Sequence, residues 1–564
     1  RNKEKMDKLV VLDFGSQYSH LICRRIREAN VYCELLPYNT PAKVIKKIDP
    51  KGIIFSGGPA SVYAKNAPKP DKEIFKMDKP LLGICYGHQV LVDNFGGKVK
   101  RTTGREYGRA GLIIEGGGRG EGGEQSDDTS DLFKGLGTGI INCWMSHADA
   151  AETLPPGFKV LARTENSFSA AIGNPEKKLY GIQFHPEVVH TEKGTQILKN
   201  FAQTISGAKP EWDIESFLEA TVNDIRKRVG KEKVLAAVSG GIDSTTVAAL
   251  MHKAIGDQLS CIFINHGLLR QDEEKEVVKL FKDHLGIKVI YVNAEKQFLG
   301  KLKGVSDPEE KRKIIGEEFA NVFAAVVKKK KGKEKDGHDD ENDVVESFQW
   351  LAQGTLYPDV IESGVSKGPA AVIKTHHNVG GLPKWLNLKV IEPLRYLYKD
   401  EVRKAAKLLG VPDELLKRHP FPGPGLAVRI IGEVTPEKIR ICKHASKIVE
   451  DELKATATSA STSASVASAT AAVNNNAGWY DKVWQAYAAV GDDRAVGVLG
   501  DERVYGHIVT IRIVESMDAM TADWSRLPYE LIEKISNRIT NEVEGVTWVT
   551  YAVSSKPPAT IEPQ

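Results

Sequence analysis

Short apolar runs that end in turns alternate with helical stretches through roughly the first two hundred residues of this chain. The clearest runs cover residues 8–14, 52–58, 80–86 and 179–185. This alternation is typical of strand–helix units that build a mostly parallel α/β sheet. Catalytic groups in such sheets gather at the carboxyl ends of the strands, so the turns after these runs are the first places to look for chemistry.

The same alternation of apolar runs and helical stretches returns after a polar, proline-containing linker candidate at residues 206–213. A second α/β unit is predicted from apolar runs at 233–241, 259–267, 288–294 and 370–377. Prolines and glycines at 419–430 break the pattern, and strand-like runs with one helix follow. The sequence therefore predicts two mostly parallel α/β domains and a smaller α+β C-terminal domain, at 8–205, 213–418 and 419–564.

Three segments look inserted into this framework, because they are glycine-rich, highly charged or of low complexity: 116–130, 328–343 and 455–478. They bury too little apolar surface to offset the entropy of ordering them, so we expect flexible surface excursions. The lysines of the second segment could touch nucleic acid, but its acidic second half favours a solvated loop. A net charge of +4 over 564 residues gives no other reason to expect nucleic-acid binding.

The six cysteines are scattered and form no C-x-x-C pair, so neither a zinc site nor a disulfide framework is expected. The longest apolar runs have the length of strands, which predicts no membrane span. The first apolar run is itself a strand rather than a secretory signal. These features predict a soluble cytoplasmic enzyme with reduced thiols.

The first candidate nucleophile is Cys85, which stands between Gly83 and Gly87 at the end of an apolar run. A lone cysteine is more often a buried core residue. Here the flanking glycines allow a sharp strand-to-helix turn that exposes the side chain, and the helix N-terminus stabilises a thiolate. The local pattern therefore favours a catalytic cysteine.

Partners for this thiol can be found on two other predicted strand ends. His185 ends the run at 179–185 and can act as base, and Glu187 can orient its ring. The amides of Gly58 and Tyr86 can bind the oxyanion of a tetrahedral intermediate. These motifs resemble the class I glutamine amidotransferases. The resemblance implies that Cys85 attacks the side-chain amide of glutamine and releases ammonia, with glutamine held by Gln89, Ser146 and His147.

A second candidate site is the loop at 239–244, which follows an apolar run and opens a helix. Its amides and the helix dipole favour a phosphate group, although a small-residue turn that packs a helix on a strand would read the same. The loop lacks the lysine of G-x-x-x-x-G-K-[ST] loops, which suggests that it holds pyrophosphate as a leaving group. Asp243 would repel bare phosphate and so suggests Mg²⁺.

This loop resembles the S-G-G-x-D-S signature of the N-type ATP pyrophosphatases. The resemblance implies that an adenylate forms on a carbonyl oxygen, with ATP and Mg²⁺ held by Ser239, Gly240, Gly241, Asp243 and Ser244. Asp243 is the implied metal ligand. Lys374, in a glycine-containing stretch that could form a lid, could neutralise charge on the α-phosphate.

Further motifs, spread over most of the chain, indicate which member of the N-type ATP pyrophosphatases the chain resembles. Segments such as 307–319, 373–383, 418–426 and 555–562 resemble the glutamine-hydrolysing GMP synthetases. The resemblance implies that XMP, ATP and glutamine give GMP, AMP, pyrophosphate and glutamate. It also implies a homodimer formed through the C-terminal domain. The implied XMP-binding residues are Arg312, Gln485, Asp501, Lys556, Thr560, Ile561 and Glu562.

The chain departs from the pattern of that family near the XMP side. Trp548 and Ala552 stand where the family usually carries an arginine and an aspartate, and the chain ends in Pro563 and Gln564 rather than Trp-Glu. Two alternatives therefore stay open. One is a non-catalytic nucleotide-sensing relative. The other is an amidotransferase that activates another carbonyl, as CTP synthase does, although that enzyme would use a kinase-type loop and a C-terminal glutaminase.

Overall fold

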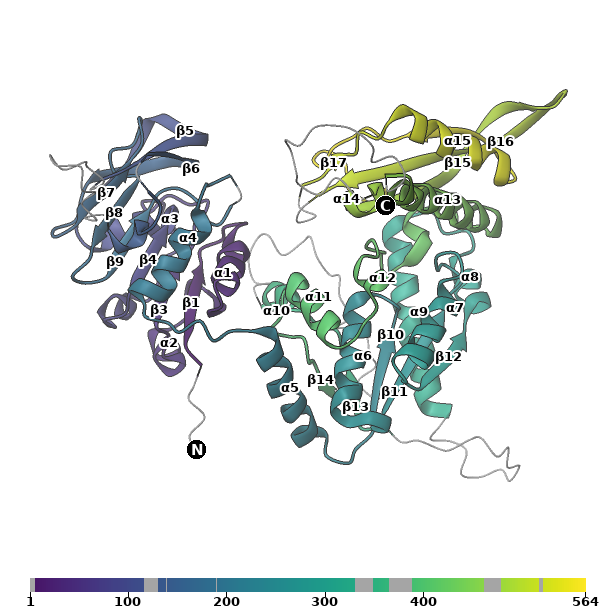
Figure 1. The fold of residues 1–564 in the computed structure, drawn as a ribbon, viewed down its shortest axis with the longest axis horizontal. Coiled ribbons are helices and arrows are strands. Elements are labelled where there is room, and N and C mark those ends of the chain that lie inside the picture. The colour runs from purple at the N-terminus through teal and green to yellow at the C-terminus, as the bar shows by residue number, and fades with distance from the viewer. Residues whose placement is uncertain are drawn as a thin grey trace. The chain divides into compact units, whose positions relative to one another are not determined.

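The structure is a computed structural model that divides into two compact units (Figure 1). The first unit contains residues 1–217 and 358–374, and the second contains 218–357 and 375–564. The described residues are 6–115, 130–137, 139–188, 190–329, 348–364, 388–460, 478–516 and 521–564. No helix within these ranges is long and apolar enough to cross a membrane.

The first unit is built on a nine-stranded sheet with the strand order β2-β1-β3-β4-β9-β8-β7-β5-β6. The first five strands in this order pair in parallel, and the remaining pairs are antiparallel. The parallel strands are β1 (Lys8–Asp13), β2 (Tyr32–Pro37), β3 (Gly52–Phe55), β4 (Leu81–Ile84) and β9 (Leu179–Ile182). The antiparallel strands are β5 (Lys98–Ile114), β6 (Ile140–Thr153), β7 (Lys159–Arg163) and β8 (Ala171–Asn174).

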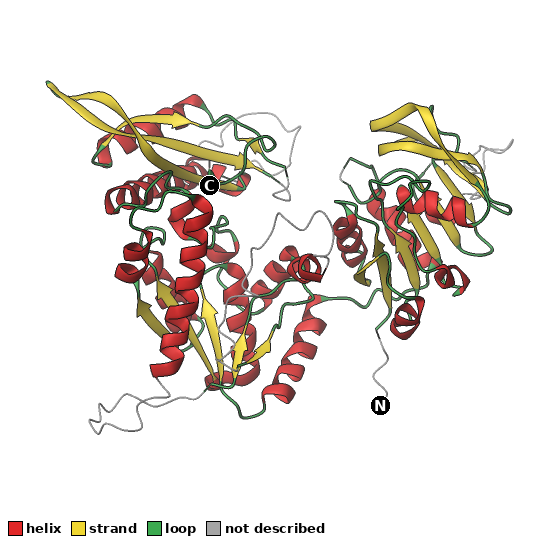
Figure 2. Cartoon of the chain, turned by 180° about the vertical axis from the view of Figure 1, so that it is seen from behind, coloured by secondary structure: helices red, strands yellow, loops and turns green. Residues whose placement is uncertain are grey.

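Helices pack against the parallel half of this sheet (Figure 2). They are α1 (Ser19–Glu28), α2 (Ala42–Ile48), α3 (Tyr86–Asn94) and α4 (Gly194–Lys199). Strands β3, β4 and β9 are buried along their whole length because helices cover them, which explains why they read as continuous apolar runs.

The second unit contains a fully parallel five-stranded sheet, ordered β12-β11-β10-β13-β14. Its strands are β10 (Val234–Val238), β11 (Leu259–Asn265), β12 (Val289–Asn293), β13 (Trp350–Ala352) and β14 (Lys389–Ile391). Its helices are α6 (Ile242–Ile255), α7 (Glu273–Lys279), α8 (Glu295–Leu302), α9 (Pro308–Lys329), α11 (Lys399–Leu408) and α12 (Asp413–Leu416). Two more helices, α5 (Ile214–Val229) and α10 (Tyr357–Gly364), cross the division between the units in sequence.

A smaller mixed sheet completes the second unit. A long antiparallel hairpin of β15 (Gln485–Leu499) and β16 (Glu502–Glu515) carries β17 (Asp523–Trp524) and β18 (Val546–Tyr551) on β16. The helices of this region are α13 (Pro436–Ala460), α14 (Trp479–Lys482) and α15 (Tyr529–Glu542). The predicted fold class, two parallel-rich α/β parts and a small α+β part, is therefore confirmed.

The boundary predicted at residues 418 and 419 lies inside one continuous apolar core. This core joins Leu235 of β10 and Ala427 to Val509 of β16. The split into second and third domains stays a prediction. The linker predicted at 206–213 is packed rather than free, since the ring of Trp212 lies 4.8 Å from that of Tyr32.

Several elements differ from the sequence predictions. The strand predicted at 370–377 lies outside the described residues, and the short strands β13 and β14 were not predicted. Helix α13 was also missed, and it includes the first residues of the segment at 455–478, which therefore starts as a helix. The rest of that segment, most of 116–130 and most of 328–343 lie outside the described residues.

Candidate active site

Cys85 stands on a sharp turn between β4 and α3. Its backbone has φ 51° and ψ −105°, a strained conformation for a residue that is not glycine. The turn needs its glycines, since a Cβ on Gly83 would lie 2.3 Å from the carbonyl oxygen of Gly87. A Cβ on Gly87 would lie 2.5 Å from the carbonyl oxygen of Phe55. This is the strand–turn–helix geometry of a nucleophile elbow.

His185 and Glu187 lie beside this turn and hold each other. The Nδ1 atom of His185 lies 2.7 Å from Oε1 of Glu187, and both side chains are buried. Burial lowers the pKa of His185, but the charge of Glu187 and hydrogen bonds with Cys85 and Glu187 hold that pKa well above its ordinary value. The imidazolium form is therefore favoured next to the Cys85 sulfur.

The glycine turn after β3 faces this pair. A Cβ on Gly57 would lie 3.0 Å from Cε1 of His185 and 3.6 Å from Cβ of Cys85. Gly57, which was not singled out from the sequence, thus leaves room for a ligand at the thiol. Its neighbour Gly58 packs on Phe14. Tyr86 is the first residue of α3, so its amide has no acceptor within the helix.

Of the residues predicted to hold glutamine, Ser146 and His147 lie on β6, and Gln89 lies on α3 and reaches β6 with its side chain. The carbonyl oxygen of Ser146 lies 3.6 Å from Sγ of Cys85. Gln89 donates from Nε2 to the carbonyl oxygen of Asp149 over 2.8 Å, and Nδ1 of His147 lies 3.1 Å from the same oxygen. Gln89 and His147 therefore brace this stretch of strand, while Ser146 is the exposed residue beside the thiol.

The loop at 239–244 joins β10 to α6 and is ordered by its own side chains. The hydroxyl of Ser244 donates to the carbonyl oxygen of Gly241 over 3.1 Å and accepts from the amide of Ser239 over 3.2 Å. Gly240 has φ 74°, and a Cβ there would lie 2.3 Å from Val277 of α7. The loop is a compact cradle of amides at a helix N-terminus, which suits an anion.

Asp243 has one paired and one unpaired carboxylate oxygen. Oδ2 accepts from Nζ of Lys399 over 2.7 Å. Oδ1 is buried and has no hydrogen-bond partner among the described residues. Lys399 begins α11 and was not predicted as a site residue, although its segment, 399–403, was part of the family resemblance. The ammonium group of Lys399 places a positive charge next to the loop, which has no lysine of its own.

The chain end lies in a polar cluster of the second unit. Glu562 accepts from Nε and Nη2 of Arg429 over 3.1 and 2.9 Å, and from Nε2 of Gln485 over 2.6 Å. Tyr487 donates its hydroxyl to the carbonyl oxygen of Ile561 over 2.7 Å. Arg512 donates to the carbonyl oxygen of Thr560 over 3.0 Å. Four of the predicted XMP residues, Gln485, Thr560, Ile561 and Glu562, are therefore gathered here.

Lys311 of α9 and Gln564 of the chain end connect this cluster to α9. Lys311 is buried and donates from Nζ to the carbonyl oxygen of Ile430 and to Oε1 of Gln564, each over 2.8 Å. Burial and the nearby Lys438 lower the pKa of Lys311 to about 8. The next residue, Arg312, was the predicted one, and it pairs with Glu309 over 3.1 Å on the same helix.

One predicted XMP residue, Asp501, is not gathered with this cluster within one chain. Asp501 lies in the turn between β15 and β16, at the opposite end of the hairpin from Gln485. Fourteen residues of strand separate them, or roughly 45 Å, so one chain does not bring them together. Lys556 bonds through its backbone to Ala522. Lys374 lies outside the described residues.

The departures noted in the sequence have defined places. Trp548 is half-exposed on β18 and donates from Nε1 to the carbonyl oxygen of Val496 over 3.0 Å. The carbonyl oxygen of Ala552 accepts from Arg512 over 3.4 Å. Trp548 is thus held by a main-chain acceptor and Ala552 by an arginine side chain.

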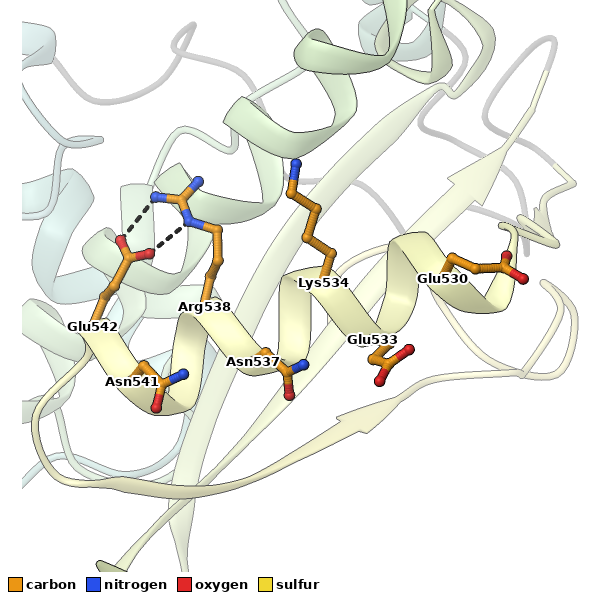
Figure 3. Close-up of a pocket in the computed structure, with 7 residues that line it drawn as sticks. All are labelled: Glu530, Glu533, Lys534, Asn537, Arg538, Asn541 and Glu542. Carbon is orange, nitrogen blue, oxygen red and sulfur yellow. Dashed lines mark hydrogen bonds and ion pairs between the residues drawn. The ribbon is translucent and has the colours of Figure 1, made fainter. Parts of the chain in front are cut away.

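A hollow of about 310 Å³ lies along α15 (Figure 3). Its lining side chains project from one face of the helix, and Arg538 pairs with Glu542 among them. Lys534 and Arg538 also pair with Glu452 of α13. These charges satisfy one another, and the hollow contains none of the groups described above.

Comparison with protein families divides the chain in the order that the structure suggests. Residues 10–205 match the class-I glutamine amidotransferase family. Residues 213–309 match the PP-loop domain. Residues 473–563 match the GMP synthase C-terminal domain.

Whole-chain relatives agree with this order. The chain is 51% identical to a GMP synthase [glutamine-hydrolyzing] of Caldanaerobacter subterraneus subsp. tengcongensis, over 99% of each chain. It belongs to the glutamine-hydrolysing GMP synthases. A GMP synthase of Carboxydothermus hydrogenoformans is 50% identical over 98% of this chain and 99% of its own. One of Gloeothece citriformis is 48% identical over 99% of this chain and 96% of its own. The glutaminase motifs of this GMP synthase therefore fall in its first unit, and the PP-loop falls in its second.

Proposed function

We propose that this GMP synthase divides its reaction between two centres, with glutamine hydrolysed at Cys85 and XMP activated at the loop 239–244. The observation that carries the proposal is the buried His185–Glu187 pair at the Cys85 elbow. It lies in a different compact unit from the phosphate cradle. Two reactions with different needs, acyl transfer and adenylation, thus have separate machinery.

In the glutaminase, the proton of Cys85 Sγ rests on His185 as an imidazolium, and the thiolate attacks the side-chain carbonyl carbon of glutamine. The amides of Gly58 and Tyr86 stabilise the oxyanion that forms. His185 then gives the proton to the departing ammonia, and water releases glutamate from the thioester. Glu187 stabilises the imidazolium and fixes the orientation of its ring. Gln89, Ser146 and His147 shape the glutamine side of the site.

In the synthetase, the C2 oxygen of XMP attacks the α-phosphorus of ATP and pyrophosphate leaves. Ser239, Gly240, Gly241 and Ser244 hold the leaving phosphates through amides and hydroxyls. Ammonia then attacks C2 and displaces AMP, which gives GMP. The loop grips a group that stays in place, so it does not need a lysine that follows a transferred γ-phosphoryl group.

Asp243 fits a magnesium ion brought in with ATP. Its Oδ1 atom is buried and unpaired among the described residues, and a carboxylate oxygen is a preferred ligand of Mg²⁺. The described residues contain no group of three or more His, Cys, Asp or Glu side chains that could hold a metal. A single carboxylate matches Mg²⁺, which takes most of its ligands from phosphates and water. When bound, the ion offsets negative charge on the pyrophosphate.

For XMP we propose a site at the chain end, made by Gln485, Thr560, Ile561 and Glu562, with Arg312 and Lys556 as the cations that the family resemblance assigns to it. Their convergence in the second unit supports this assignment, since Glu562 and Gln485 bond directly. Lys374 remains the proposed partner of the α-phosphate. Asp501 lies too far along the hairpin to join these residues within one chain.

We further propose a cytoplasmic homodimer formed by the C-terminal region. The hairpin and β18 expose Val496, Val498, Tyr505 and Trp548, which are 41%, 72%, 65% and 54% exposed. Apolar side chains grouped in this way mark interaction surfaces. Sedimentation should show a dimer. The double variant Val498→Asp with Tyr505→Asp should dissociate it, whereas the control Val44→Asp, on α2, should leave it intact. All six cysteines are free, as suits a reducing compartment.

One assay tests the activity against the non-catalytic alternative. The protein is incubated with XMP, Mg-ATP and either glutamine or ammonium, and the nucleotides are separated. GMP and AMP in equal amounts from either nitrogen source are expected. A protein that binds XMP but forms neither product would be a nucleotide sensor.

A further inference from the structure

Strand β6 forms one end of the nine-stranded sheet, and its outer edge is covered by the segment that follows the catalytic histidine. The amide of His185 donates to the carbonyl oxygen of Trp144 over 3.0 Å. The amide of Glu192 donates to the carbonyl oxygen of Asn142 over 2.9 Å. The carboxylate of Glu192 accepts in return from Nδ2 of Asn142 over 2.8 Å. The histidine segment is thus bonded to the strand that carries Ser146.

The hydroxyl of Thr191 closes this contact into a ring. It donates to the carbonyl oxygen of His185 over 2.6 Å and accepts from the amide of Trp144 over 3.0 Å. The amide of His185 completes the ring by bonding back to Trp144. Thr191 is only 5% exposed, so both main-chain groups depend on this hydroxyl rather than on water.

Thr191 therefore joins the backbones of two parts of the glutaminase through one hydroxyl. On one side is the backbone of His185, whose ring meets Glu187 and the Cys85 thiol. On the other is Trp144, two residues before Ser146, whose carbonyl oxygen lies 3.6 Å from Sγ of Cys85. We propose that Thr191 is a positioning residue that fixes His185 relative to the glutamine-facing strand β6, and so sets the rate of thiol attack. This inference rests on the assignment of glutamine hydrolysis to Cys85.

Removal of the hydroxyl should lower the rate of hydrolysis more than it weakens glutamine binding, because Thr191 orients the base. In Thr191→Val the shape is kept, but the Trp144 amide and His185 carbonyl lose their shared partner. A displacement of about 1 Å at a reacting group costs up to about 10²-fold in rate. We expect the kcat of glutamine hydrolysis to fall about tenfold or more, with KM changed less than about threefold. Thr191→Ser keeps the hydroxyl and should stay within about threefold of wild type.

The matched control is Thr164→Val in the same unit. Thr164 is 4% exposed, and its hydroxyl accepts from the amide of Ser167 over 3.0 Å. It lies in the turn between β7 and β8 and bonds to neither His185 nor Trp144 in the bonds described above. This variant loses a similar buried hydrogen bond, so it reports what ordinary destabilisation does to the assay.

The experiment measures three quantities in the full-length protein: glutamine hydrolysis, GMP formation from ammonium, and the rate at which iodoacetamide alkylates Cys85. Thr191→Val should lose hydrolysis and label more slowly, while GMP formation from ammonium stays at the wild-type rate. The proposal is overturned if Thr191→Val hydrolyses glutamine normally, if Thr191→Ser fails to rescue, or if Thr164→Val shows the same loss. If Cys85→Ala still hydrolyses glutamine, the assignment of Cys85 fails instead, which is a separate result.

Discussion

Arg429 donates two parallel hydrogen bonds to the carboxylate of Glu562, over 3.1 Å from Nε and 2.9 Å from Nη2. The guanidinium is almost fully buried, with the rings of Tyr487 and Phe421 centred 4.3 and 5.0 Å from it. Gln485 donates to the same carboxylate. The end of the chain is therefore held in one orientation by a planar, charge-assisted clamp.

The first prediction concerns this clamp. Glu562→Gln removes one charge of a buried pair and leaves Arg429 uncompensated, which should lower stability by about 3 kcal/mol. It should also raise the KM for XMP about tenfold or more, since Glu562 is a proposed nucleotide contact. Arg429→Lys should raise the same KM by misorienting Glu562, because lysine cannot make the two-pronged contact. Unchanged XMP kinetics in both variants would limit the clamp to folding.

The second prediction separates the two centres. Cys85→Ala should abolish GMP formation from glutamine and leave GMP formation from ammonium close to wild type, since the thiol belongs only to the glutaminase. Both rates are measured in one preparation with saturating XMP and Mg-ATP. Equal loss of both, in a protein with normal circular dichroism, would contradict this assignment of Cys85.

The third prediction concerns pH. Burial by itself would lower the pKa of His185. The charge of Glu187, together with hydrogen bonds to Glu187 and Cys85, raises that pKa instead, so His185 stays protonated. Glu187→Gln removes that charge while burial remains, so the pKa of His185 should fall. The alkaline limb of glutamine hydrolysis, where the imidazolium is lost, should then move to lower pH. The maximal rate should also drop by about 10²-fold or more. A rate loss without any shift of the limb would show that Glu187 acts by orientation alone.

The proposed glutaminase triad could be read from the sequence because each member lies at or just after a strand end with a local signature. Cys85 has glycines on both sides, and His185 closes an apolar run two residues before Glu187. The contacts of the second unit had no such signature. Lys399 meets Asp243 across 156 residues, and Arg429 meets Glu562 across 133. Only the folded sheet and tail bring these partners together.

The family resemblance assigned Gln485 and Asp501 to one site, but within one chain the hairpin of β15 and β16 carries them to opposite ends. Strands β13 and β14 have three residues each, too few for periodicity to reveal. Helix α13 did carry a signal, since Ile441, Ala445 and Ile448 recur at helical spacing and are buried.

The fourth prediction identifies the bond that breaks at the phosphate loop. With XMP labelled by ¹⁸O at C2, the label should appear in the phosphate of AMP, since the C2 oxygen attacks the α-phosphorus. Label in inorganic phosphate, with ADP as product, would restore a kinase-type activation. Asp243→Asn should lose adenylation while glutamine hydrolysis survives in some form, because it leaves the first unit unchanged.

The last prediction uses the departure at the chain end. Lys311 donates to the neutral amide oxygen of Gln564, and burial with the nearby Lys438 lowers its pKa to about 8. A lysine whose pKa is lower in the folded state destabilises the fold while it is charged. That penalty is complete below about pH 8 and is relieved as the pH rises toward the pKa of the unfolded chain, about 10.4.

Gln564→Glu places a carboxylate at the same contact and restores the residue that the family pattern carries there. The opposite charge should raise the pKa of Lys311 and stabilise the protein near pH 7 by about 1 kcal/mol, or roughly 2 °C in the unfolding midpoint. The gain should shrink as the pH rises and Lys311 loses its proton in both proteins. Lys311→Met is the matched background, because without the ammonium group the new carboxylate has nothing to pair with and should not stabilise. Thermal unfolding of the four variants at pH 7 and pH 10 measures this coupling. An equal gain in the Lys311→Met background would mean that the carboxylate acts through another partner.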